Sequence, residues 1–533
     1  MTSTFHGLET ARRGMFTQQS ALQVTGHNIA NANTPGYSRQ RVNFVQTEPY
    51  PPASMNRPQI PGQMGTGVKA GSIQRVRESF LDVQFRTEQN KLGYWESRST
   101  ALIKMEDIMN EPSENGLSAV LGEFWQGLQD LSTYPENEGT RQVVLQRGQA
   151  VVDTFHYLSD SLTTIKNDIG NELGVNLKDI NSILKQIGDL NKQISDIEPH
   201  GYLPNDLYDQ RDLLVDELSK HLNIKVEKKP VGGNALAVAD GIYHIKMING
   251  DGTETELVTG IDFKQIGFTG SDNKLAYDIP ESIENITIFD AKGETAQGTI
   301  SYSDNFPAGE LKGLIESYGH GPTGSVKGIY PDMLKDIDKL AFSFASIFNE
   351  IHSKGLDLNG KKGTDQFFIT TGSFEGTAQS IELGSLNPSD IAASTKGTEN
   401  VSVDAGDGKN ALNLANISSM LLSNTNQKLE GLTDEIDLTT LSEIQTGTLN
   451  SFYEGIIGRL GVDSMQANRL KNNSQVLSDS VNQNRQSVSS VSLDEEMTNL
   501  IQFQHAYNAA ARQITVVDEM LDKIINGMGH VGR

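Results

Sequence analysis

The 533-residue chain contains no cysteine. Disulfide frameworks, zinc–thiolate sites and cysteine nucleophiles are therefore excluded. Basic residues are also scarce, because 44 Lys and Arg stand against 68 Asp and Glu, which gives a formal net charge of −24. Phosphate binding needs clustered Lys and Arg, so this balance argues against a nucleic acid as partner.

Long apolar runs are absent as well. No stretch of the sequence approaches the ~18 consecutive apolar residues that a membrane span needs. The N-terminus lacks the charged start, apolar core and small-residue cleavage site of a secretory signal. We therefore expect no membrane partner, and any export should proceed without a cleaved signal peptide.

Residues 1–31 predict one helix with a narrow apolar stripe. The stripe recurs every seven residues, at Leu8, Met15, Leu22 and Ile29. The other faces carry Gln, Thr, Arg and Ser, and a lone helix with so thin a stripe is barely stable in water. We therefore expect this helix to need a partner.

An exit turn follows the first helix, and its residues are Asn31, Asn33, Thr34, Pro35, Gly36 and Tyr37. Asn31 and Asn33 tolerate left-handed backbone geometry, and Pro35 prevents the helix from continuing. Gly36 after a proline suits a turn position with positive φ.

The C-terminal residues from about 491 to 527 predict a second helix, roughly 55 Å long. Its apolar residues follow the a/d pattern of a coiled-coil seam over about four heptads, with the main positions at Leu493, Leu500, Phe503, Tyr507, Ile514, Val517 and Leu521. The two stripes predict a coiled-coil-like axial domain formed by residues 1–40 and 491–533, with these apolar residues as its assembly interface. A two-helix hairpin within an ordinary globular domain would show the same periodicity.

The two ends of the chain also differ in charge. Residues 1–45 hold four arginines and one glutamate, whereas residues 493–533 hold six carboxylates and three basic residues. Opposite charges favour pairing of the ends, although exposed ion pairs contribute little stability each.

The middle of the chain predicts helices around a β-rich insertion. Residues 41–223 and 326–490 predict a mostly helical, rod-like domain, with a mixed segment near 360–410. Residues 224–325 predict a β-rich outer domain, because Ile242–Ile248 and Ile283–Phe289 alternate between apolar and polar residues. The expected fold class is thus mainly α, with several domains and a β-rich insertion.

Two further expectations concern the helical parts. Apolar residues fall three or four apart from Leu158 to Ile197, which predicts a long helix with a break near Gly170 or Gly174. Residues 411–533 are expected to be helical again.

No constellation of catalytic or metal-ligating residues is evident. The ten histidines form no local metal-binding spacing, and neither a Gly-x-Ser-x-Gly elbow nor a P-loop is present. Five carboxylates cluster in one segment, at Asp206, Asp209, Asp212, Asp216 and Glu217. They alternate with Arg211 and Lys220, so we interpret them as a solvated, salt-bridged helix face rather than an acid pair. We expect no enzymatic activity, no cofactor and no metal.

Several segments resemble one family. Residues 28–40 (NIANANTPGYSRQ) are similar to the N-terminal signature of flagellar rod, hook and hook-associated proteins, and residues 492–497 (SLDEEM) and 504–512 (QHAYNAAAR) resemble its C-terminal motif. Residues 204–212 (PNDLYDQRD), 124–131 (FWQGLQDL) and 348–357 (FNEIHSKGLD) resemble the hook-associated members that form the hook–filament junction. The likeness covers roughly residues 1–230, 310–370 and 450–533.

The resemblance implies an extracellular structural subunit of the bacterial flagellum that self-assembles into a helical tube. Its implied partners are copies of itself, the flagellar hook protein, hook-associated protein 3 and an export chaperone on the C-terminal helix. It also implies export through the flagellar type III apparatus. Two alternatives remain, namely a hook or distal-rod subunit, and a secreted hydrolase or adhesin whose terminal helices merely dimerise.

Overall fold

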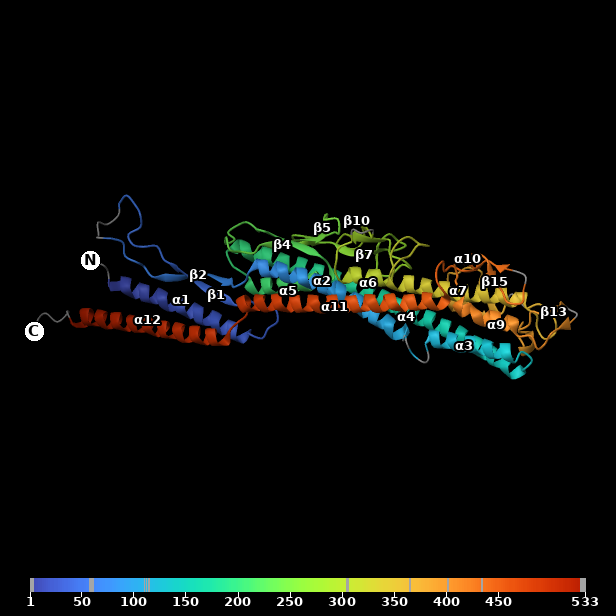
Figure 1. The fold of residues 1–533 in the computed structure, drawn as a ribbon. Coiled ribbons are helices and arrows are strands. Elements are labelled where there is room, and N and C mark those ends of the chain that lie inside the picture. The colour runs from blue at the N-terminus through green and yellow to red at the C-terminus, as the bar shows by residue number, and fades with distance from the viewer. Residues whose placement is uncertain are drawn as a thin grey trace, which may run out of the picture.

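The structure is a computed structural model that describes residues 4–56, 62–109, 111, 113, 116–302, 306–363, 366–399, 402–432 and 435–527. Figure 1 shows an elongated molecule with both termini at one end and long helices along its length. The fold is mainly helical with small antiparallel sheets, and the N- and C-terminal helices lie side by side. This confirms the predicted fold class.

The helical body of the molecule, here called the rod, is formed by α2 (Ser79–Met109), α3 (Leu117–Thr133), α4 (Glu138–Ile197), α5 (Asn205–His221), α6 (Glu310–Tyr318), α7 (Ile329–Lys354) and α11 (Leu449–Ser489). α4 alone has 60 residues, so it extends about 90 Å. α11 packs along α2, and α3 and α7 pack on α4. Phe124, Phe344 and Phe348 meet in the core between these helices.

The predicted break in the long helix is wrong, because α4 continues through Gly170 and Gly174. Both glycines permit a close approach of other elements instead. A Cβ atom on Gly170 would lie 2.9 Å from the Tyr318 ring, and one on Gly174 would lie 3.2 Å from the carbonyl oxygen of Tyr277. The glycines therefore mark the side of α4 on which the insertion packs.

The insertion forms two four-stranded antiparallel sheets on α4. The first has the order β3 (Ile224–Lys229), β4 (Ile242–Ile248), β5 (Glu254–Thr259) and β6 (Asp262–Phe263), and the second has the order β10 (Ala296–Ser301), β9 (Asn285–Phe289), β7 (Gln265–Thr269) and β8 (Leu275–Ala276). Their buried residues join the core of the rod. Residues 310–318, expected within the β-rich part, instead form α6 and return the chain to α2 and α4.

Two buried asparagines attach the sheets to α4. Asn191 accepts a hydrogen bond from the Tyr243 N–H at 3.1 Å and donates to the Tyr243 carbonyl oxygen at 2.9 Å. Asn181 makes the same pair of bonds with Ile266, at 2.7 and 2.8 Å. Each amide thus satisfies both backbone groups of one strand residue, as a neighbouring strand would.

The far end of the rod carries short elements, namely β11 (Phe368–Ile369), α8 (Thr377–Ser380), β12 (Glu382–Leu383), β13 (Gly397–Thr398), β14 (Ser402–Val403), α9 (Lys409–Ala415), β15 (Gln427–Lys428), β16 (Glu435–Ile436) and α10 (Leu438–Leu441). Among the described residues, 3₁₀ turns also occur at Glu198–His200, Pro388–Asp390 and Asn416–Ser419. The expectation of helix throughout 411–533 is therefore wrong between α9 and α11. Polar side chains there form hydrogen bonds with nearby backbone groups. The Asp437 carboxylate, for example, accepts from the Thr439 N–H, and such local bonds compete with helix formation.

The same asparagine contact recurs at this end. Asn349 of α7 bonds both backbone groups of Phe368, at 2.7 and 2.9 Å, and Asn413 of α9 bonds both groups of Glu430, at 3.0 and 2.8 Å. Irregular segments are thereby fixed to helices without long strands.

The end that holds both termini, here called the terminal unit, consists of α1 (Thr4–Ala30), β1 (Gln40–Gln46), β2 (Val68–Arg75) and α12 (Leu493–Gly527). β1 and β2 pair antiparallel, with a bulge between Asn43 and Phe44, and pack on α1. The unit has its own small core of Ala21, Val24 and Val42, with Ile73 and Phe503 packed against it.

We predict that Asn191→Leu lowers the free energy of unfolding by about 3 kcal/mol. The substitution leaves both backbone groups of Tyr243 buried without a partner, and each such group costs roughly 1–3 kcal/mol. Urea denaturation followed by circular dichroism measures this. Lys192→Leu, at an exposed position of the same helix, is the control and should change stability by less than about 0.5 kcal/mol. Equal effects of the two substitutions would refute the proposed role of Asn191.

Candidate assembly site

α1 and α12 form an antiparallel pair with a regular register. Three contacts define it, namely Gly7 with Val517, Gly14 with Ala510 and Asn28 with Glu496. The same register places Ala21 opposite Phe503, which packs against the small core of the terminal unit. A Cβ atom on Gly7 or Gly14 would lie 4.0 Å from its partner, so the backbones approach closely. The seam therefore combines small residues of α1 with larger residues of α12.

The predicted apolar stripes flank this seam. Ten of the eleven predicted residues are half-buried, namely Leu8, Met15, Leu22, Ile29, Leu500, Phe503, Tyr507, Ile514, Val517 and Leu521. Leu493 differs, because 51% of its surface is exposed. The α1 residues that lie closest to α12 come one position earlier than the predicted stripe, since heptad spacing fixes the face of a helix only to within about one residue.

A buried polar node closes the seam at its inner end. Asn28 donates to the Gln40 carbonyl oxygen at 2.8 Å and to Glu496 at 3.1 Å, and it accepts from the Gln40 N–H at 3.0 Å. Arg39 donates to Glu496 at 2.8 Å and also pairs with Glu495. These contacts tie α1, β1 and α12 together at one point.

The predicted pairing of opposite charges occurs at this node. Arg39 is the residue of the basic N-terminal segment that reaches the acidic start of α12. Arg12 and Arg13 bind Glu9 of their own helix instead. Charge therefore anchors the base of the helix pair within the described chain.

The exit turn lies beside this node. Gly36 has φ +78°, as predicted, and a Cβ atom there would lie 3.3 Å from Leu213 of α5. Asn31 and Asn33 tolerate left-handed backbone geometry, but neither has a positive φ here. Asn31 instead caps the turn, because its carbonyl oxygen accepts from the Thr34 N–H at 2.9 Å. Asn33, Thr34 and Pro35 are exposed.

Tyr37 links the turn to the node. Its hydroxyl donates to Asn28 at 2.8 Å and lies 3.0 Å from the His27 ring. Burial, followed by the charge of Asp206, raises the pKa of Tyr37, so the phenol stays protonated as a donor.

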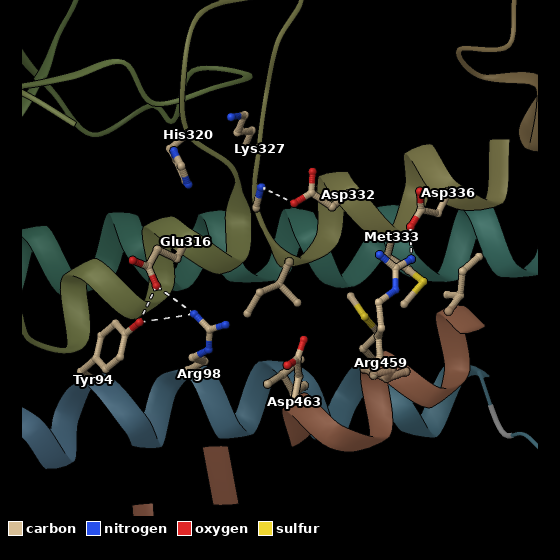
Figure 2. Close-up of a pocket in the computed structure, with 16 residues that line it drawn as sticks. Tyr94, Arg98, Glu316, His320, Lys327, Asp332, Met333, Asp336, Arg459 and Asp463 are labelled. Atoms are coloured by element: carbon tan, nitrogen blue, oxygen red, sulfur yellow. Dashed lines mark hydrogen bonds and ion pairs between the residues drawn. The ribbon is translucent and has the colours of Figure 1, made fainter. Parts of the chain in front are cut away.

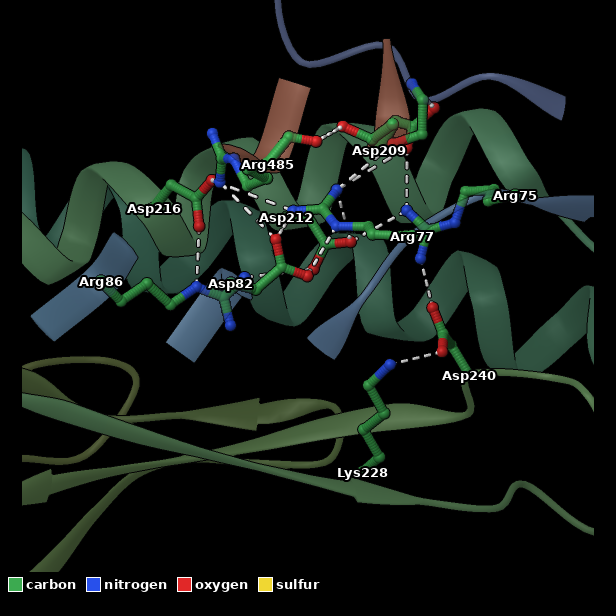
Figure 3. A network of polar contacts seen from close by, with 12 residues as sticks. Arg75, Arg77, Asp82, Arg86, Asp209, Asp212, Asp216, Lys228, Asp240 and Arg485 are labelled. Carbon is green, nitrogen blue, oxygen red and sulfur yellow. Dashed lines mark hydrogen bonds and ion pairs between the residues drawn. The ribbon is translucent and has the colours of Figure 1, made fainter. Parts of the chain in front are cut away.

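The terminal unit meets the rod in a dense cluster of ion pairs, here called the joint (Figure 3). The joint contains the arginines Arg75, Arg77, Arg86 and Arg485 and the aspartates Asp82, Asp209, Asp212, Asp216 and Asp240. They come from β2, α2, α5, α11 and the loop before β4. Charge therefore holds the β2–α2 segment, with Arg77 in its connection, against α5, the loop before β4 and α11.

Asp212 lies at the centre of the joint and is almost completely buried. Its carboxylate accepts from Arg75 at 2.8 Å and from the Tyr243 hydroxyl at 2.9 Å, and it lies 3.2 Å from Arg77. Burial by itself raises the pKa of Asp212, but Arg77, Arg75 and Arg86 outweigh it and hold this pKa well below its usual range. Asp212 therefore stays ionised at physiological pH.

The other two buried aspartates of α5 join further segments. Asp209 accepts from the Ser38 N–H at 3.0 Å and from Arg75 at 2.8 Å, which connects the exit turn to β2. Asp216 accepts from Arg86 at 2.7 Å and pairs with Arg485. The Arg485 guanidinium also lies 4.0 Å from the centre of the Phe85 ring, where a cation–π contact adds to the pairing.

The interpretation of the acidic cluster as a solvated face is wrong for Asp209, Asp212 and Asp216, which are buried. It holds for Asp206 and Glu217, which are exposed. The partner arginines Arg75, Arg77 and Arg86 lie more than 100 residues earlier in the chain, so helical periodicity could not reveal them. An ionised carboxylate bound to arginines also cannot act as a general acid near neutral pH.

One groove of about 490 Å³ opens between α2, α6, α7 and α11 (Figure 2). Several of its polar groups bind one another, since Glu316 accepts from Tyr94 at 2.6 Å and from Arg98 at 3.0 Å. Burial and the bond to Glu316 raise the pKa of Tyr94 to about 12, so this phenol is no base. Among the described residues, no group of three or more His, Asp or Glu side chains could hold a metal ion.

Several known proteins are similar to the chain. Residues 102–368 match the family described as "Flagellar hook-associated protein FlgK helical domain". The "Flagellar hook-associated protein 1" of Bacillus subtilis (strain 168) is 44% identical over 538 residues, which cover 100% of both chains. The chain belongs to the flagellar hook-associated protein 1 family.

Other members of the family and flagellar basal-body rod proteins support this assignment. The "Flagellar hook-associated protein 1" of Salmonella typhimurium (strain LT2) is 26% identical over 97% of this chain and 98% of its own. Residues 8–37 match "Flagella basal body rod protein", and residues 482–527 match "Flagellar basal body rod FlgEFG protein C-terminal". As a member of the hook-associated protein 1 family, the chain is a structural, extracellular component of the flagellum and not an enzyme.

A solved structure shares the fold of this hook-associated protein. "The structure of the flagellar hook junction protein FlgK from Burkholderia pseudomallei" superposes with a TM-score of 0.56 at 15% identity, over 76% of this chain and 100% of that one. No helix within the described residues is long and apolar enough to cross a membrane.

Sequence reasoning missed the residues that fix the terminal unit in place. Asn28 carried a sequence signal, because it follows Gly7, Gly14 and Ala21 in the same heptad position. Glu496 is the residue of α12 that this register places opposite Asn28. The arginines of the joint carry no signal that can be recognised in a single sequence.

We predict that Asp212→Asn lowers the free energy of unfolding by about 3–5 kcal/mol at pH 7, because it leaves buried guanidinium groups without their counter-charge. Thermal or urea unfolding measures this, with Glu217→Gln on the exposed side of the same helix as control.

The effect of Asp212→Asn should depend on pH. The folded-state pKa of Asp212 is depressed, so its contribution is present above its unfolded pKa of about 4 and is lost as pH falls below that value. The difference between wild type and variant should shrink towards pH 3. This difference isolates Asp212 from Asp209, whose pKa burial raises. A constant difference from pH 7 to pH 3 would contradict the assignment.

Proposed function

We propose that the chain joins the flagellar hook to the filament, and that it assembles into a helical tube with copies of itself through the terminal unit. The observation that carries this proposal is the apolar surface that α12 leaves exposed after pairing with α1. Large apolar side chains on its outer faces include Leu493, Met497, Ile501, Val516, Met520, Ile524 and Ile525. An isolated chain gains nothing from such a surface, whereas a polymer buries it.

The small core of the terminal unit supports the same conclusion. Four apolar residues are buried there, namely Ala11, Ala21, Val24 and Val42, whereas the rod has a continuous core along its length. Burial in a polymer adds about 25 cal/mol per Å² of apolar surface. Neighbouring copies would therefore supply most of the stability that the terminal unit lacks.

Head-to-tail contacts suit this geometry. The exposed faces of α1 and α12 differ in sequence and in charge, so they form a heterologous contact that propagates as an open helix rather than a closed dimer. We also propose a division of the chain into three parts. The terminal unit forms the axial part, the rod with α6 forms the body, and the two sheets between Ile224 and Ser301 form the outer part.

We further propose three partners for the termini and the ends of the tube. They are the hook protein below, hook-associated protein 3 above and an export chaperone that covers the C-terminal helix before assembly. The exposed apolar residues of α12 are the surface on which a chaperone would act. The match of residues 102–368 to the hook-associated helical domain favours the junction over a rod or hook subunit, because the rod-protein families match the two ends of the chain.

We predict that Leu500→Asp combined with Ile514→Asp abolishes incorporation into flagella and swimming. Both residues face the helix pair, whose core is separate from that of the rod. The melting temperature of the purified chain should therefore stay within about 2 °C of wild type. Gln502→Asp with Thr515→Asp, at exposed positions of α12, is the matched control and should swim. Normal swimming of the first variant would refute assembly through this helix.

We also predict fast hydrogen exchange in residues 4–30 and 495–525 of the free chain, with slow exchange in α4. Few apolar contacts protect the terminal helices, and such elements open locally. Exchange followed by mass spectrometry measures this, and polymerised samples should show protection in both segments. Slow exchange of both segments in the free chain would contradict ordering on assembly.

A further inference from the structure

The β-rich insertion leaves and rejoins the rod at one narrow place, here called the neck. The chain leaves at His221, the last residue of α5, and returns through Gly309 to α6. The two connections touch, because a Cβ atom on Gly309 would collide with the His221 carbonyl oxygen. Asn90 of α2 donates to the carbonyl oxygens of Ser219 and Ala308, at 3.1 and 2.9 Å. One neutral side chain therefore ties both connections of the insertion together at any pH.

An ion pair joins the same two connections a second time. Nδ1 of His221 lies 3.0 Å from Oε2 of Glu310, and both side chains are largely buried. His221 ends α5 and Glu310 begins α6, so the dipole of each helix stabilises the charge at its end. Burial by itself raises the pKa of Glu310, but the hydrogen bond from His221 and the charges of His221 and Lys220 outweigh it and hold this pKa below its usual range.

The same nitrogen of His221 has a second neighbour on another helix. Nδ2 of Asn176, on α4, also lies 3.0 Å from Nδ1 of His221. A protonated ring carries hydrogen on both nitrogens, so its Nδ1 donates to Glu310, and the Asn176 amide donates to Glu310 as well. A neutral ring with its hydrogen on Nε2 instead accepts from Asn176 at Nδ1. The protonation state of one atom therefore selects between α6 and α4.

The other charged groups at the neck keep their charge near neutral pH. Four of them line a pocket of about 230 Å³ beside Glu310, namely Lys220 of α5, Glu96 and Lys104 of α2, and Glu172 of α4. Lys220 pairs with Glu96 at 3.0 Å. Two lysines thus offset two carboxylates, and histidine is the side chain that changes its charge between pH 5 and 8. The charge balance at the neck therefore depends on His221.

We propose that His221 is a pH-sensitive clasp at the base of the insertion. Between about pH 4.5 and pH 6.5, Glu310 is ionised and His221 is protonated, so the ion pair holds α6 to the end of α5. Above this range the ring is neutral and accepts from Asn176, so Glu310 is released and the returning connection loosens. The insertion stays attached in both states, because the bonds of Asn90 do not depend on pH.

Hydrogen exchange of the full chain at pH 5.5 and pH 8.5, followed by mass spectrometry, tests the clasp. After correction for the intrinsic effect of pH on exchange, peptides of α6 should exchange about tenfold faster at pH 8.5 than at pH 5.5, because the ion pair that holds the start of the helix is lost. α4 should stay protected at both pH values. His221→Gln removes the titrating group, so the corrected rate of α6 should no longer depend on pH.

The control is His200→Gln, at an exposed histidine of the 3₁₀ turn before α5. It should keep the pH dependence of the wild-type chain. Glu310→Gln covers the case in which His221→Gln disturbs the fold, because it removes the partner charge from the other side. In that variant, too, α6 should exchange at the same corrected rate at both pH values.

Two results would overturn the clasp. One is an α6 exchange rate in the wild-type chain that, once corrected, is the same at pH 5.5 and pH 8.5. The other is a pH dependence that persists unchanged in both His221→Gln and Glu310→Gln, since the titrating group would then lie elsewhere.

Discussion

A single type of contact recurs at five places where a strand or irregular segment meets a helix in the described part of this protein. A helix-borne asparagine bonds the N–H and the C=O of one residue, in the pairs Asn28–Gln40, Asn181–Ile266, Asn191–Tyr243, Asn349–Phe368 and Asn413–Glu430. The side chain is neutral and carries one acceptor and one donor group, so it matches a peptide unit at any pH. An aspartate could not donate, and an apolar residue would leave two backbone groups unsatisfied. The helices can thus carry short strands that would not be stable alone.

The ion pairs of the joint have a different role, because they hold the terminal unit at a fixed orientation to the rod. Buried charges contribute little net stability when they are compared with apolar residues, but they tolerate few alternative arrangements. Asp212 contacts Arg75 and Tyr243 in one geometry, and a shifted β2 would leave Arg75 buried without a counter-charge. The joint therefore specifies orientation, while apolar packing supplies the stability of each part.

Local patterns predicted the helices well and their partners poorly. Heptads at Leu8–Ile29 and Leu493–Leu521 predicted both terminal helices, and alternation predicted β4 and β9, because each signal lies within one element. Gly170 and Gly174 suggested a break in the helix. Their packing role was hidden, because the Tyr318 ring and the Tyr277 carbonyl oxygen that approach them are distant in sequence. Asp209, Asp212 and Asp216 suggested a solvated face for the same reason. Of the candidate assembly site, the sequence predicted the two helices. Their register and the joint depend on contacts between segments more than 100 residues apart.

The chain crosses from the terminal unit to the rod twice, between β2 and α2 and again between α11 and α12. A swivel requires a single covalent connection, because two parallel connections must wind around each other when one body turns. The joint lies between these crossings, with Arg75 on one side and Arg485 on the other. A torque on α1 and α12 would therefore be passed to the rod as shear across buried ion pairs. The molecule is built as a torsionally stiff coupling rather than as a hinge.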